Sequence, residues 1–246
     1  MQRVYIYNDS FESLISLILI LLSKKVKPDN IKNSEYAPNL FEEKIILVVN
    51  EKLANDFLEK LDRKNLSIIY YAFLSEKSDC ELVIYYYILN YLKYGTKTYF
   101  FRNLKCVNKV LAYSTYVSGE NHKFKGFTRF EEKENKVLYA VINPTSNILG
   151  LLSLHFQKRL RNELWMIEDV GRNIISVYDK KHFYIISKNS LKISIDALSK
   201  QEQQMQNLWK EFYNVIAIKE RENLKCRQNF MPKKYWKNIC EVKDEL

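Results

Sequence analysis

The sequence predicts an α+β fold: a helical N-terminal part, then an antiparallel sheet of about five strands with packed helices, and a long amphipathic C-terminal helix. Apolar and tyrosine residues at three- and four-residue spacings over 66–94 indicate the helical part. Five short extended runs between 122 and 187, separated by polar turns, indicate the sheet. We therefore expect residues 1–246 to form a single cooperative unit, subdivided if at all into a mostly helical part, 1–95, and a sheet-plus-helix part, 96–246.

The first residues predict a strand that leads into a buried helix. Residues 3–7 (RVYIY) have the composition of a short strand. Asp9 and Glu12 have the spacing of a capping box that would begin a helix over 11–22. That apolar run is too short to cross a bilayer and carries Glu12 near its start. We therefore expect no targeting signal, no membrane association and a cytoplasmic protein.

The next segment predicts a loop and further helices. Two prolines in the polar stretch 28–40 predict a surface loop. Residues 44–50 fit either a strand or the lead-in to a helix that continues to Leu61. The helical pattern of 66–94 should end at Gly95, because glycine readily adopts the backbone conformation that closes a helix.

The second half predicts a hairpin, a helix and a meander. A strand over 122–130 should pair with 137–143 through a turn at 134–136. Pro144 ends the second strand, and Ser146 can cap a helix. The apolar stripe of that helix is Ile148, Leu151, Leu152, Phe156 and Leu160, and three extended runs follow at 164–170, 173–178 and 182–187.

The C-terminal helix is predicted from a second capping box. Ser199 and Glu202 have the required spacing. Behind them an apolar stripe, which we expect to be buried, recurs at helical spacing at Met205, Leu208, Trp209, Phe212 and Ile216.

The segment 122–130 is also the centre of the functional hypothesis. Read as a strand, one of its faces is His122, Phe124, Gly126, Thr128 and Phe130, and the other is Lys123, Lys125, Phe127 and Arg129. Cations that neutralise phosphates beside a ring on which a base can stack meet the requirements of nucleic-acid binding. The structural alternative is an ordinary half-exposed strand whose Phe127 belongs to a second small core.

The charge of the chain is consistent with a polyanionic partner. The formal net charge is +10 and the isoelectric point about 9.2. Between Leu82 and Gly119 there is no acidic residue, while cations alternate with aromatic residues there. The segment 219–237 carries seven cations against two glutamates; the cations are Lys219, Arg221, Lys225, Arg227, Lys233, Lys234 and Lys237.

Sequence motifs give no indication of a cofactor or a metal, and we expect neither. The four cysteines form no C-x-x-C pair, so reduced thiols are expected. The three histidines lie far apart, without zinc spacing. A nucleophile elbow, a phosphate-binding loop and an H-E-x-x-H motif are all missing from the sequence.

Weak catalytic candidates nevertheless exist. His122 or His155 with the carboxylate of Asp169 could form an acid–base pair, and arginines could bind phosphate. The structural alternative makes Asp169 and Arg172 an ion pair at a strand end and His155 a packed histidine. The residue pattern alone favours the structural alternative.

Residues spread over nearly the whole chain give it a family resemblance. The sequence resembles a bacterial family described as DNA metabolism or DNA repair proteins and as a domain of unknown function (4130). The resemblance rests on VYIY and SFESL near the start, Tyr70–Glu76, Glu120, His122, Lys125–Phe127, Arg129-Phe130, His155-Phe156, Arg159, Trp165, Ile167, Asp169, Arg172, Trp209, Ile218, Arg221, Asn223, Met231-Pro232 and Tyr235-Trp236. Asn8 and Ser13 depart from the family pattern, where Asp and Gly are commoner.

The resemblance implies a role beside a radical-SAM protein that modifies or repairs DNA. Some relatives are fused to a uracil-DNA glycosylase-like domain, and the family has no established catalytic residues to carry over. Three hypotheses follow: a DNA-binding or substrate-delivery partner of the radical-SAM enzyme, an enzyme acting on a damaged base or nucleotide, or a protein-interaction module. We favour the first, with the oligomeric state open. The expected nucleic-acid-binding residues are Lys123, Lys125, Phe127, Arg129, Arg159, Arg172, Arg221 and Lys225.

Overall fold

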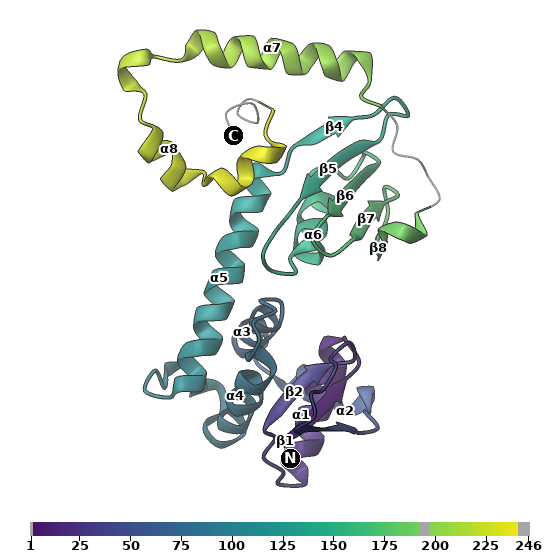
Figure 1. The fold of residues 1–246 in the computed structure, drawn as a ribbon, viewed down its shortest axis with the longest axis vertical. Coiled ribbons are helices and arrows are strands. Elements are labelled where there is room, and N and C mark those ends of the chain that lie inside the picture. Colours follow the sequence, from purple (N-terminus) through teal and green to yellow (C-terminus); the bar gives the residue numbers. More distant parts are fainter. Residues whose placement is uncertain (1, 192–196, 241–246) are drawn as a thin grey trace. The chain divides into compact units, whose positions relative to one another are not determined.

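The computed structural model describes residues 2–191 and 197–240 and shows a mixed α and β protein (Figure 1). The chain divides into two compact units, 1–119 and 120–246. The division lies inside one long helix and further along the chain than the 95/96 boundary considered from the sequence.

The first unit contains a parallel sheet that the sequence did not predict. Its strands are β1 (Gln2–Tyr7), β2 (Asn30–Asn33) and β3 (Glu42–Ile46), in the order β2-β1-β3. Both outer strands run parallel to β1. The expected loop over 28–40 therefore contains β2, whose polar sequence NIKN hides it from a search for apolar alternation.

Helices pack against this sheet and form the hydrophobic core of the first unit with it. They are α1 (Phe11–Ser23), α2 (Glu51–Lys60), α3 (Arg63–Phe73), α4 (Cys80–Tyr94), η1 (Gly95–Phe100) and the first part of α5 (Lys105–Phe127). Ser10, rather than Asp9, caps α1 by accepting the N–H of Ser13. Gly95 ends α4 with a φ of 63°, as the sequence predicts.

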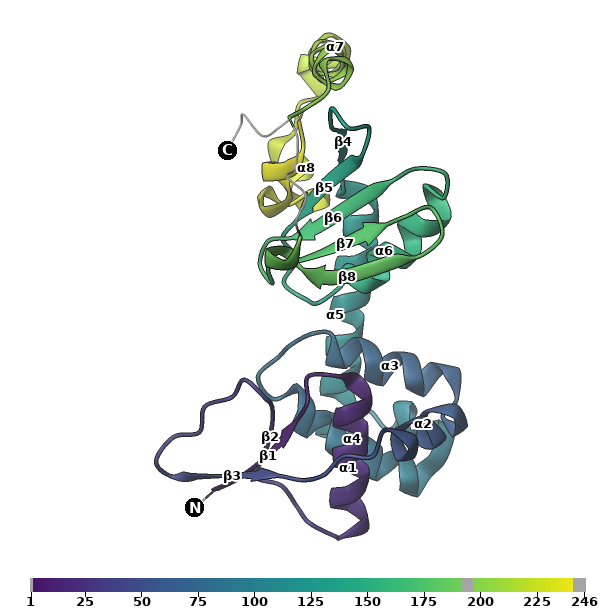
Figure 2. The ribbon, with the colours of Figure 1, turned by 90° about the vertical axis from the view of Figure 1, so that its right-hand side faces the viewer.

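The second unit contains a five-stranded sheet in the order β4-β5-β6-β7-β8 (Figure 2). Its strands are β4 (Phe130–Glu132), β5 (Leu138–Ile142), β6 (Trp165–Asp169), β7 (Ile174–Tyr178) and β8 (Phe183–Ser187). The β4–β5 hairpin and the β6–β7–β8 meander are antiparallel as predicted, but β5 and β6 are parallel. The prediction of an antiparallel sheet is wrong at this pair because helix α6 (Leu149–Arg159) provides the crossover that parallel strands need.

Helix α6 packs on one face of this sheet (Figure 1). Its Ser153 hydroxyl donates to Ser176 on β7 at 2.7 Å, and Phe156 contacts Phe130 at 4.9 Å between ring centroids. On the opposite face the buried Glu168 carboxylate accepts hydrogen bonds from the Tyr139 hydroxyl and, at 2.5 Å, from the Lys188 ammonium. Both faces of the sheet therefore carry buried side chains.

The predicted strand over 122–130 is wrong. Residues up to Phe127 form the last two turns of α5, and only Phe130 belongs to β4. The alternation of cations and aromatic residues has a period close to two, but residues 105–121 continue into it as an unbroken helix. Side chains expected on one strand face therefore point in different directions around the helix.

The C-terminal segment contains α7 (Lys200–Ile216), η3 (Lys219–Arg221), α8 (Leu224–Phe230) and η4 (Lys233–Asn238). Ser199 caps α7 by accepting the N–H of Glu202, as predicted. The expectation of a buried stripe is wrong, because α7, described over its full length, buries none of its side chains. Tyr235 and Trp236 in η4 are buried instead.

Across residues 2–191 and 197–240, no helix combines the length and the apolar character that crossing a membrane requires.

Candidate functional site

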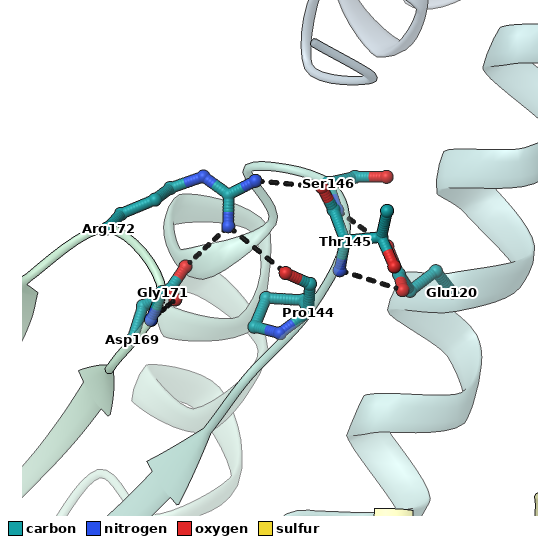
Figure 3. A network of polar contacts seen from close by, with 7 residues as sticks. All are labelled: Glu120, Pro144, Thr145, Ser146, Asp169, Gly171 and Arg172. Carbon is teal, nitrogen blue, oxygen red and sulfur yellow. Dashed lines mark hydrogen bonds and ion pairs between the residues drawn. The ribbon is translucent and has the colours of Figure 1, made fainter. Parts of the chain in front are cut away.

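A buried carboxylate on α5 holds the loop between β5 and α6. Glu120 is 4% exposed, and its two oxygens accept the backbone N–H groups of Thr145 at 3.0 Å and Ser146 at 2.8 Å (Figure 3). One of these oxygens also lies 3.2 Å from the ammonium of Lys234 in the C-terminal segment. Glu120 therefore ties a loop and the chain terminus to the same helix.

An arginine holds the same loop from its other side. Arg172 donates to the carbonyl oxygens of Pro144 at 3.2 Å and Thr145 at 2.9 Å, and to the carboxylate of Asp169 at 2.9 Å (Figure 3). Asp169 is fully buried and also accepts the N–H of Gly171. We call Glu120, Asp169 and Arg172 the loop clamp, because together they bind both the donors and the acceptors of the loop backbone.

The pKa values of the two clamp carboxyls are shifted in opposite directions. Burial opposes ionisation of Glu120, but the hydrogen bonds from Thr145 and Ser146 and the contact with Lys234 outweigh it and lower its pKa. For Asp169, burial outweighs the Arg172 guanidinium and raises the pKa. Glu120 is thus held as an anion by donors aimed at it.

Two cations from separate helices, Lys125 of α5 and Arg159 of α6, act electrostatically on one histidine, His155 of α6. Burial lowers the pKa of His155, and the positive charges of Lys125 and Arg159 lower it further. The Nε2 atom of His155 is buried without a hydrogen-bond partner. Lys125 belongs to the end of α5, and Arg159 follows His155 by one turn of α6. We call Lys125, His155 and Arg159 the cationic face.

The other residues of segment 122–130, which we expected on the faces of one strand, lie apart in the structure. Lys123 and His122 are exposed on α5. Phe127 packs against Tyr235 with ring centroids 5.1 Å apart, so it belongs to a small core and not to an open stacking surface. Arg129 follows the helix and donates to the carbonyl oxygen of Gly126 at 2.8 Å.

The two expected tail residues lie elsewhere in the second unit. Arg221 and Lys225 are exposed on η3 and α8. Arg221 lines a wide hollow of about 910 Å³ enclosed by the end of α7 and by α8, which Tyr213 and Arg227 also line. Arg227 stacks over Trp236 at 4.5 Å. The roles of all eight residues in DNA binding stay predictions.

The catalytic candidates do not form an acid–base pair. The Asp169 carboxylate bonds to Arg172 and Gly171, while His155 is influenced by cations. Within the described ranges no group of three or more His, Cys, Asp or Glu side chains could hold a metal ion.

The sequence did not predict two of the residues that bond to Glu120 of the loop clamp. Lys234 stood in the cationic tail without a partner assigned to it, and Ser146 was expected to cap α6. Ser146 instead gives its backbone N–H to Glu120. The sequence signal that could have identified this site is the position of Glu120. It is a single acidic residue at the end of a cation-rich run that contains no other acid, which suggests a specific partner for its carboxylate.

The sequence model of one protein family, described as a domain of unknown function (DUF4130), matches residues 78–241. The chain belongs to the DUF4130 family. The DUF4130 match includes the loop clamp, the cationic face and the whole five-stranded sheet, whereas strands β1–β3 precede it. No curated protein and no solved structure matches the chain.

Proposed function

We propose that this protein is a non-catalytic, cytoplasmic DNA-binding partner in DNA metabolism and repair, and that its second unit holds DNA through the cationic face. The observation that carries this proposal is that two cations from separate elements, Lys125 on α5 and Arg159 on α6, both lower the pKa of the same imidazole, that of His155. A phosphate group placed there would meet two positive charges and a polar ring.

The clamp supports the same proposal. Glu120 and Asp169 are buried and bonded to backbone N–H groups and to Arg172, so their negative charges are compensated inside the unit. The neighbouring cations at the surface keep their attraction for a polyanion. The role in DNA metabolism and repair and the delivery of the DNA to a radical-SAM repair enzyme are the parts of the proposal that rest on the family resemblance.

DNA binding by the intact protein tests the proposal. Lys125→Ala with Arg159→Ala should weaken binding of every sequence alike and flatten the dependence of log affinity on log salt by about one to two units, because fewer counterions are released. The matched control is Lys24→Ala with Lys27→Ala, an exposed pair in the first unit. Equal effects of the two pairs would mean diffuse attraction and would refute a defined face.

The same titration has a second readout. A bound phosphate should raise the pKa of His155, because a nearby anion favours the imidazolium ion. The chain has three histidines, and the exposed His122 and His182 serve as internal references in an NMR titration. A rise at His155 no larger than at the two references would count against contact at this face.

A specific observation favours a second function, that of a protein-interaction module. Leu208 is 59% exposed and Val215 83% exposed on α7, which is unusual for apolar residues at helical spacing. If α7 docks the radical-SAM partner, Leu208→Asn with Val215→Asn, which adds no charge, should abolish co-purification of the two proteins and leave DNA affinity unchanged.

A further inference from the structure

Three hollows with shared lining residues lie between strands β4 and β5 and the C-terminal segment, and we call them together the groove. The first is lined by Phe127 and Tyr235, among others, and shares Lys237 and Asn238 with the second. The second, of about 100 Å³, shares Arg129 and Asn238 with the third. The third, of about 270 Å³, opens between β4 and α7.

The third hollow has an aromatic wall. Trp209 and Met205 of α7 form one side, and Phe130 of β4 lines the other. Trp209 is 47% exposed, and Phe212 lies 5.7 Å from it between ring centroids. An exposed indole at the side of a hollow offers a flat surface on which a second aromatic ring can stack.

The groove is lined by more cations than carboxylates. Arg129, Lys234 and Lys237 line it, against Glu131 and Glu202. Two of these charges have partners outside the groove lining: Glu131 lies 3.1 Å from Lys133, and Lys234 lies 3.2 Å from Glu120. The wider segment 200–240 has nine cations and four glutamates, the cations being Lys200, Lys210, Lys219, Arg221, Lys225, Arg227, Lys233, Lys234 and Lys237. A negatively charged ligand with flat apolar groups matches this lining.

We propose that this groove binds single-stranded nucleic acid, with an unpaired base stacked on Trp209 and the backbone passing Lys237 and Arg129. A positive groove that follows the backbone, combined with an aromatic ring for the bases, is how proteins hold single strands without sequence preference. A duplex keeps its bases stacked inside, so it cannot present one to a hollow of this size. This inference rests on the proposed function and specifies the strand form that the second unit prefers.

Trp209 makes the proposal directly measurable in the full-length protein. The chain has three tryptophans, and the other two, Trp165 and Trp236, are 0% and 1% exposed. A short oligothymidylate should therefore quench tryptophan fluorescence through Trp209, and a duplex of the same length should quench it much less. Trp209→Phe should remove the quenching while keeping a ring in the groove.

Affinity provides the decisive comparison. Trp209→Ala should weaken oligothymidylate binding by about 5- to 150-fold and leave the salt dependence and the duplex affinity unchanged, because stacking releases no counterions. The matched control is Tyr184→Ala, an exposed aromatic residue on β8 at the opposite edge of the sheet. Circular dichroism should show both variants folded, since neither side chain is buried.

Each other outcome has a defined meaning. Equal effects of Trp209→Ala and Tyr184→Ala on oligothymidylate would overturn the groove as a single-strand site. The proposed function would survive that result if removing Lys125 and Arg159 still flattened the salt dependence. If neither oligonucleotide binds, both proposals fail, and the groove with its apolar wall becomes a docking site for protein.

Discussion

At the scale of single residues, Glu120 joins three parts of the second unit. Its carboxylate accepts the backbone N–H groups of Thr145 and Ser146 and lies 3.2 Å from the ammonium of Lys234. An amide cannot replace it, because the NH₂ group of a glutamine would face one of these donors.

We therefore predict that Glu120→Gln lowers the free energy of unfolding by about 1.5–3 kcal/mol, the range for hydrogen bonds to a charged group. Lys234→Ala, which removes only the half-exposed ion-pair partner, should cost less than about 1 kcal/mol. Chemical denaturation measures both. A smaller loss for Glu120→Gln than for Lys234→Ala would show that the loop does not depend on the carboxylate.

The pH dependence of the same pair follows from the lowered pKa of Glu120. A carboxyl whose pKa is lowered by folding stabilises the folded state above its ordinary value of 4.5, and this contribution disappears as the pH falls through the lowered pKa. The stability difference between the native protein and Glu120→Gln should therefore shrink below pH 4.5. A difference that stays constant in acid would contradict the role of the ionised carboxylate.

At the scale of elements, the C-terminal segment packs on the second unit through η4, whereas α7 is joined to β4 at its N-cap, where Ser199 bonds to Glu132. Tyr235 contacts Phe124 and Phe127, each at 5.1 Å between ring centroids, and Asn238 donates to the carbonyl oxygen of Val141 on β5. We predict that Tyr235→Ala costs about 3–5 kcal/mol of stability, as for other large buried aromatic residues. Leu208→Ala on the exposed α7 is the control and should change stability by about 0.5 kcal/mol or less. The reverse order of the two effects would mean that α7 is the element that packs.

The sequence predicted those elements whose pattern is set locally. The β6–β7–β8 meander, the Ser199 cap of α7 and the end of α4 at Gly95 follow from turn residues, hydroxyl caps and glycine. Elements decided by distant partners were missed. The parallel pairing of β5 with β6 depends on where α6 packs, and the exposure of Trp209 depends on which C-terminal residues reach the sheet.

The candidate site shows the same division. The sequence identified Lys125, His155 and Arg159 one by one, and in the fold the charges of Lys125 and Arg159 both lower the pKa of His155. Phe127 was assigned to a strand face, but helix α5 turns it toward Tyr235, a partner more than a hundred residues away. Long-range packing of this kind leaves no local pattern in the sequence.

At the scale of the whole molecule, the expectation of a single cooperative unit stays a prediction that two probes can test. All three tryptophans lie in the second unit, and the buried Cys80 lies in the first, where burial raises the pKa of its thiol to about 12. Because α5 belongs to both units, we expect tryptophan fluorescence and Cys80 thiol reactivity to change at the same urea concentration. Separate midpoints would show that the units unfold independently.

The contact between Lys234 and Glu120 also has a consequence during protein synthesis. The two residues are 114 positions apart, so at ribosomal speeds of about 5–20 residues per second Glu120 is made roughly 6–23 seconds before its partner. About the same time passes between the synthesis of Phe124 and Phe127 and that of their contact partner Tyr235. We therefore expect the rings of Phe124 and Phe127 to lack their Tyr235 contact during that interval, and a chain that ends before Tyr235 to be more sensitive to proteolysis than the full chain.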